Sequence, residues 1–176
     1  DLSNQLSESG RDQEADQVDR LAFSFIEELI ANLPETALDY ELMAWFLVTC
    51  PDLQLWDSTR AAELTQKAVE LSQRAVELSP QMREAWNALG VAQYRASNLQ
   101  DAITALDKSL ELEGDHRSAL FYLAMAHAQL GDQDEAHQWY DRAIEWMKNN
   151  NSDNEMLRRL RAEAEGLLGV EVRGEG

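Results

Sequence analysis

The chain has 176 residues, of which 44% are hydrophobic, so it can bury one core or one short repeat array. Its formal net charge is −18, and such a surface repels both the phosphate backbone of nucleic acids and anionic membrane surfaces. We therefore expect no nucleic-acid partner and no membrane contact in this segment. The charge either favours basic partners or simply keeps the protein in solution. The single cysteine excludes an intrachain disulfide.

The spacing of apolar residues predicts an all-α chain. The prolines agree with this, because Pro34, Pro51 and Pro80 all fall between predicted helices, where a missing N–H is tolerated. In chain order, the predicted helices cover residues 13–33, 37–49, 59–79, 82–96, 99–112, 117–130, 133–148 and 152–168. Capping boxes are predicted at the starts of four of them, at Thr36-x-x-Asp39, Asn98-x-x-Asp101, Asp132-x-x-Glu135 and Ser152-x-x-Glu155.

The third predicted helix contains a duplicated heptad, because residues 68–74 are followed by the nearly identical residues 75–81. Seven residues make nearly two helical turns, so the insertion keeps each face in its direction while lengthening the helix by about 10 Å. Leu64, Leu71 and Leu78 then lie on one long apolar stripe. We expect either the loop around Trp56 or a second copy of the chain to cover its excess, which makes these leucines candidate oligomer contacts.

Two adjacent blocks, residues 83–116 and 117–150, align without gaps. Trp86-x-x-Leu89-Gly90 is matched by Leu120-x-x-Leu123-Ala124, and Asp101-Ala102 by Glu135-Ala136. The pattern resembles the tetratricopeptide repeat (TPR) family, whose repeats have about 34 residues. The family positions are occupied by Trp86, Leu89, Gly90, Ala102 and Leu110, and then by Gly131, Asp132, Ala136, Tyr140 and Ala143. The small residues Gly90, Ala102, Ala124 and Ala136 let paired helices approach closely.

This resemblance implies a right-handed superhelix of helical hairpins, an α-solenoid of about three units with flanking and capping helices. A single domain is expected over residues 13–169, after a frayed segment 1–12 and before a disordered tail 170–176. Its expected parts are a partial unit 13–36, an enlarged unit 37–82, the repeats 83–116 and 117–150, and a capping helix 151–169. Residues 44–52 resemble a variant of the TPR motif that occurs in bacterial multidomain proteins. We therefore expect a bacterial-type TPR domain of a larger protein. A cytoplasmic location is favoured.

Catalytic and metal sites find little support in the sequence. No phosphate-binding glycine loop and no G-x-S-x-G nucleophile motif is present. His127 and His137 lie on paired helices, but neither they nor His116 has a neighbouring cysteine, and good metal sites need three or four ligands. We predict no catalytic residue, no metal and no cofactor.

The resemblance also implies that ligands bind on the concave face, which the first helix of each unit lines. The predicted binding residues are Glu41, Trp45, Asn87, Val91, Tyr94, Phe121 and Met125. This set suits an extended peptide or an amphipathic helix with basic flanks. In the alternative interpretation, the same residues pack against neighbouring helices or against terminal helices folded into the groove. TPR proteins that bind the C-terminal carboxylate of chaperones use lysine, arginine and asparagine side chains in the groove. This groove offers Asn87 and Arg95 but no matching lysines, so we do not expect it to bind chaperone C-termini.

These observations favour a scaffold or adaptor that binds a protein or peptide segment. The alternative is a homo-oligomerisation module of a larger protein that acts through the extended helix 59–79, with a homodimer as one possible product. An enzyme is a distant third interpretation.

Overall fold

The computed structural model describes residues 21, 24–32, 36–49, 58–112, 117–150 and 155–170. The chain divides into two compact units, residues 1–35 and 36–176. In the first unit, residues 24–31 are helical, inside the helix predicted at 13–33. The described residues contain no strand, which agrees with the predicted all-α class. Predictions for residues 1–12, the loop around Trp56, His116, the cap at Ser152 and the tail 171–176 lie outside the described residues.

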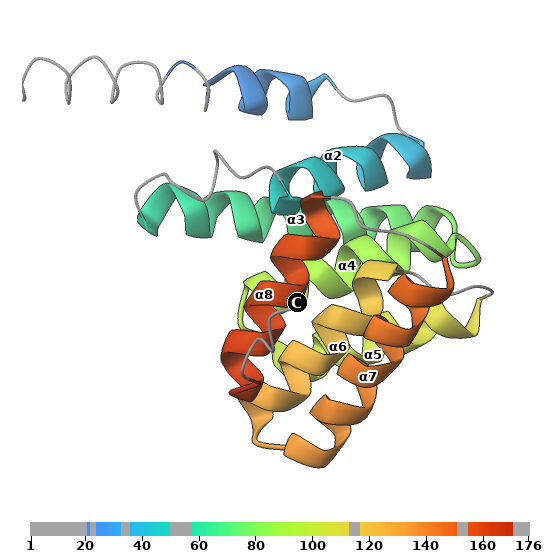
Figure 1. The fold of residues 1–176 in the computed structure, drawn as a ribbon. Coiled ribbons are helices and arrows are strands. Elements are labelled where there is room, and N and C mark those ends of the chain that lie inside the picture. Colours follow the sequence, from blue (N-terminus) through green and yellow to red (C-terminus); the bar gives the residue numbers. More distant parts are fainter. Residues whose placement is uncertain are drawn as a thin grey trace, which may run out of the picture. The chain divides into compact units, whose positions relative to one another are not determined.

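In its described part, the second unit is a series of helices (Figure 1). They are α2 (Ala37–Thr49), α3 (Ser58–Leu78), α4 (Arg83–Arg95), α5 (Leu99–Glu111), α6 (Arg117–Leu130), α7 (Gln133–Asn149) and α8 (Glu155–Leu168). From residue 37 to residue 149, each predicted helix end lies within one residue of the observed one. The apolar spacing was therefore sufficient to locate the helices.

Consecutive helices pack as the pairs α2–α3, α4–α5 and α6–α7. Each pair also contacts the next, through α3 against α4 and α5 against α6, and the first helices follow one another as α2, α4 and α6. We call the side lined by α2, α4 and α6 the first-helix face. This stacking of helical hairpins is the predicted α-solenoid.

Gly90 shows why small residues are needed where paired helices meet. A Cβ atom at Gly90 would lie 2.5 Å from Cγ and 2.7 Å from Cδ2 of Leu106 on α5. Ala102, Ala124 and Ala136 have no exposed surface. The close approach of the helices therefore depends on these side chains.

The capping prediction was correct at one helix and wrong at two. At α2, the Asp39 N–H donates to Thr36 Oγ1 at 3.3 Å, and the Thr36 hydroxyl donates to the Asp39 carboxylate. Asn98 and Asp132 precede α5 and α7 but make no side-chain cap bond. The Asn98 amide instead donates to Gln93 Oε1 at 2.8 Å. The end of the preceding helix therefore offered the Asn98 side chain a partner other than its own helix end.

The lengthened helix α3 is covered along most of its apolar stripe. Leu64, Ala68, Leu71 and Ala75 are all buried within this single chain, whereas Leu78 is 45% exposed. Of the three candidate oligomer contacts, only Leu78 offers substantial surface to a second copy. Oligomerisation through Leu64, Leu71 and Leu78 stays a prediction.

Candidate functional site: the first-helix face and its cleft

Helix α8 lies on the first-helix face, because it packs extensively against α6 and much less against α7. Inside the array, each new unit packs on the second helix of the preceding unit, α4 on α3 and α6 on α5. Helix α8 instead packs mainly on α6, which is a first helix. The residues that α8 buries recur at helical spacing, as expected for one face of an amphipathic helix. They are Leu157, Leu160, Ala164 and Leu168, together with Glu165. The helix predicted at 152–168 is thus present, and its role as a cap stays a prediction.

Most of the predicted binding residues are buried in this arrangement. Val91, Phe121 and Met125 have no exposed surface, and Glu41, Asn87 and Tyr94 are nearly as inaccessible. Trp45 is half-buried. A partner would therefore reach most of this set only after a rearrangement. As partner contacts, these seven residues stay a prediction.

The seam between α2 and α4 holds two of these residues in a polar setting. Burial, and then the nearby Glu84 carboxylate, raises the pKa of Glu41 above its ordinary value. Asn87 lies three residues after Glu84 on the same helix, and its Oδ1 atom is buried without a hydrogen-bond partner among the described residues. A buried amide oxygen in this state costs free energy.

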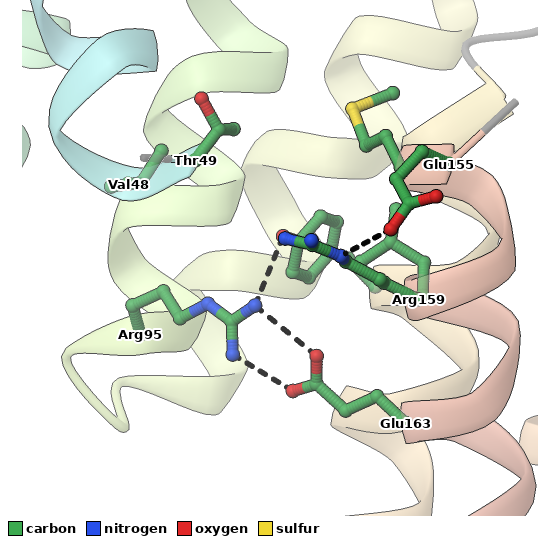
Figure 2. A pocket seen from close by; sticks show the side chains of 9 residues that line it. Val48, Thr49, Arg95, Glu155, Arg159 and Glu163 are labelled. Carbon is green, nitrogen blue, oxygen red and sulfur yellow. Dashed lines mark hydrogen bonds and ion pairs between the residues drawn. The ribbon is translucent and has the colours of Figure 1, made fainter. Parts of the chain in front are cut away.

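A cleft of about 370 Å³ remains open beside α8. Its walls come from Val48 and Thr49 at the end of α2, Arg95 at the end of α4, Tyr122 on α6, and Glu155, Met156, Arg159, Leu160 and Glu163 on α8 (Figure 2). The cleft therefore collects side chains from all three first helices and from α8. Repeat position predicted Arg95 and Val48 as groove residues but did not predict the others.

The cleft is organised around the Arg95 guanidinium, which points toward α8 (Figure 2). Its two terminal nitrogens donate to the two oxygens of Glu163, at 2.8 and 3.2 Å, and Nη2 donates to the Tyr122 hydroxyl at 3.4 Å. The guanidinium carbon lies 5.6 Å from the ring centroid of Tyr94 and 5.5 Å from that of Tyr122. Such forked pairing and ring stacking are typical of arginine and would be lost with lysine.

The Arg95 surroundings have a clear electrostatic consequence. Burial opposes the charged form of Arg95, but Tyr122 and Glu163 outweigh burial and raise the pKa of Arg95. Burial and the Glu163 carboxylate also raise the pKa of Tyr94 to about 12. At neutral pH, Arg95 is therefore a fixed cation held between two protonated tyrosines and one carboxylate. Its Nε atom is buried without a hydrogen-bond partner among the described residues.

The cleft rim carries a second, exposed ion pair. Arg159 Nε donates to Glu155 Oε1 at 3.2 Å, and both side chains are largely in solvent. Exposed pairs of this kind contribute little stability. The rim is therefore polar and adaptable. The apolar part of the cleft wall is formed by Val48, Met156 and Leu160.

A different contact attaches α8 to the last repeat. The Tyr140 hydroxyl of α7 donates to Glu165 Oε1 at 2.7 Å, and Arg161 Nε donates to the same oxygen at 2.8 Å. Burial opposes the charge on Glu165, but these two hydrogen bonds outweigh burial and hold the pKa of Glu165 below its ordinary value. Helix α8 thus has one polar attachment to α4 and another to α7.

The histidines do not gather with other metal ligands in the described part of the chain. His127 Nδ1 lies 3.6 Å from Asp132 Oδ2, and His137 Nδ1 lies 2.7 Å from the Gln133 carbonyl oxygen. Among the described residues, no group of three histidine, cysteine or acidic side chains is placed to hold a metal ion. No helix within that part is long and apolar enough to cross a membrane.

Comparison with known proteins identifies the architecture. The human PEX5-related protein is 38% identical over 71 residues, which are 40% of this chain and 11% of that protein. The crystal structure of a thermophilic TPR protein of Thermus thermophilus matches with a TM-score of 0.59 at 20% identity, over 87% of this chain and 76% of that one. A family model for the tetratricopeptide repeat matches residues 57–115 and 96–153, which together span more than half of the chain. The chain therefore belongs to the tetratricopeptide repeat family, as its two gapless blocks predicted.

Proposed function

We propose that this TPR array is a scaffold that binds a segment of a partner protein on its first-helix face. The observation that carries the proposal is the cleft between α2, α4, α6 and α8, which stays open while α8 covers the adjoining surface. A cleft of this size admits one large side chain of a bound segment. No catalytic step is part of the proposal.

The chemistry of the cleft favours an apolar anchor residue flanked by polar or basic groups. Val48, Met156 and Leu160 provide apolar wall, and methionine adapts its shape to different ligands. The chain as a whole carries a net charge of −18, which attracts basic segments at long range. Because Arg95 is already paired with Glu163, a ligand side chain entering the cleft meets a neutralised ion pair rather than a free cation.

Two matched threonine variants test this proposal. Thr49 lines the cleft and its hydroxyl donates to the Trp45 carbonyl, while Thr104 on α5 is exposed and its hydroxyl donates to the Gln100 carbonyl. Thr49→Trp places an indole in the cleft, whereas Thr104→Trp adds the same side chain elsewhere on the surface. Both variants lose the same hydroxyl–carbonyl bond, so that loss cancels in their comparison.

The probe is a library of displayed peptides selected on the unmodified full chain. We expect the selected peptides to bind Thr49→Trp at least about tenfold more weakly, a loss of about 1.4 kcal/mol, and to bind Thr104→Trp unchanged. Equal binding to both variants would move the interaction away from the cleft. A selection that yields no binding peptide would contradict the proposed function itself.

A further inference from the structure

We propose that α8 is a built-in ligand of the first-helix face and that the external partner is an amphipathic helix with the same chemistry. This rests on the proposed binding at the first-helix face, and it adds the class of partner and a binding mode in which the partner takes the place of α8 instead of binding beside it. The partner would present an apolar stripe like that of Leu157, Leu160, Ala164 and Leu168. It would also place a carboxylate where Glu163 meets Arg95.

Helix α8 packs on the helix that carries two of the predicted ligand-contacting residues. Phe121 and Met125 lie on α6 and are completely buried, and Phe121 also contacts Tyr140 of α7. Repeat position predicts that these side chains face a ligand, and the chain's own helix packs on the element that carries them. Apolar and methionine-rich surfaces are well suited to binding the apolar face of a helix.

Arg95 determines what any replacement for α8 must carry. Its side chain is three-quarters buried, and within the described part of the chain Glu163 on α8 supplies the carboxylate that pairs with it. A helix that replaced α8 and buried Arg95 again without supplying an anion would leave a largely buried cation without a carboxylate partner, which is strongly unfavourable. A competing helix therefore needs an acidic residue at the corresponding position.

The sequence of α8 itself resembles the ligand that the acidic chain is expected to favour. Arg158, Arg159 and Arg161 lie within about one turn, in a chain with only 15 lysines and arginines against 33 acidic residues. The helix thus combines an apolar stripe, a basic cluster and the carboxylate opposite Arg95. An apolar stripe of this kind is the feature by which an amphipathic helix docks on an apolar surface.

Helix α8 also contains a residue that weakens it without a packing reason. Gly166 lies inside the helix, and a Cβ atom there would meet nothing within 4 Å. Glycine in a helix interior is less favourable than alanine, and here the close approach that explains Gly90 is absent. A helix weakened in this way exchanges with a competitor more readily than one optimised for stability.

The test uses the full chain and a fluorescein-labelled synthetic peptide of residues 152–170 as the probe. In the unmodified chain, the attached α8 competes with the peptide at an effective concentration on the order of millimolar, so we expect weak binding. Glu163→Gln in the chain removes the carboxylate opposite Arg95 and weakens the attached helix, while the peptide keeps its own Glu163. We expect the peptide to bind this variant about tenfold more tightly than it binds the unmodified chain.

The matched control is Ala162→Lys, which changes the net charge by the same amount at an exposed position of α8. Binding to this variant should stay within about twofold of the unmodified chain, because long-range charge effects on exposed sites are screened. A peptide carrying Glu163→Gln should lose the tenfold gain on the Glu163→Gln chain. Equal affinity of the peptide for the unmodified and Glu163→Gln chains would overturn the inference.

Hydrogen exchange of the unmodified chain provides a second measurement that needs no variant. The amides of α8 should exchange at least about tenfold faster than those of α6, because α8 leaves the face without global unfolding. Equal protection of α6 and α8 would contradict the inference even if the variants failed to fold. Library peptides that bind the cleft while the 152–170 peptide does not would refute this inference and leave the proposed function intact.

Discussion

Helices α6 and α2 are both first helices of a repeat, yet their surroundings differ greatly. On α6, every residue from Ser118 to Ala126 is buried, between α7 and α5 on one side and α8 on the other. On α2, the apolar side chains of Leu38, Leu42 and Phe46 are 54%, 55% and 45% exposed. Both helices are rich in apolar residues around their circumference. Repeat position therefore sets which face of the helix a residue occupies, while the neighbouring helix sets whether that residue is core or surface.

The largest expected loss of stability comes from alanine substitutions that compare the two helices directly. Phe121→Ala on α6 removes a completely buried ring that also contacts Tyr140 edge to face, with the ring centroids 6.3 Å apart. We expect it to lower the free energy of unfolding by about 3–5 kcal/mol. Phe46→Ala on α2 should cost about 1 kcal/mol or less, because the ring is already half in water. Urea denaturation of both variants measures the difference, and equal costs would show that α2 is covered in solution.

The next effect tests the close packing between the two helices of one repeat. Gly90→Ala places a methyl group within 2.7 Å of two Leu106 side-chain carbons and 3.1 Å from its backbone nitrogen. The expected loss of stability is about 1–3 kcal/mol, even though alanine is the better helix former. A melting temperature at or above that of the unmodified chain would mean that α4 and α5 can separate without cost.

An effect of comparable size concerns the bond that attaches α8 to α7. Tyr140→Phe removes the hydroxyl that donates to Glu165, and we expect a loss of about 1.5–3 kcal/mol at pH 7. The folded protein holds the pKa of Glu165 below its unfolded value of 4.5. The stabilisation is therefore complete above that pH and is lost as pH falls through the lowered pKa. The deficit of Tyr140→Phe, measured by urea denaturation, should shrink below about pH 4.5, and a deficit independent of pH would refute this account.

The smallest expected effect is a gain of stability, and it comes from the same glycine-to-alanine substitution at a second position. Gly166→Ala adds a methyl group where no atom lies within 4 Å, so it should stabilise α8 by up to about 1 kcal/mol. Hydrogen exchange of the α8 amides should slow accordingly, while α4 and α5 stay unchanged. The same substitution thus destabilises one site and stabilises the other, which separates the effect of packing from that of helix propensity. Loss of stability at Gly166 would reveal a contact that only glycine permits.

The helices between residues 37 and 149, their ends and the repeat family could all be read from the amino-acid sequence. Apolar spacing and proline positions are local features, and local hydrogen bonding and side-chain sterics act on them directly. The need for glycine at Gly90 was also readable, because a fixed repeat places this residue where two helices meet. The capping boxes at Asn98 and Asp132 were predicted wrongly, since a cap depends on backbone geometry and competing partners that a four-residue pattern does not contain.

What covers the first-helix face depends on contacts between helices that are distant in the sequence. Repeat position puts Phe121 and Met125 on that face, but nothing in their own repeat shows that α8 packs on the same helix. The cleft likewise depends on Thr49, Arg95, Tyr122 and Glu163, which come from four helices far apart in the sequence. Glu163 is one of 33 acidic residues, and only its distance from Arg95 distinguishes it. Periodicity specifies the direction of a side chain, whereas its partners depend on how helices distant in the chain are arranged in space.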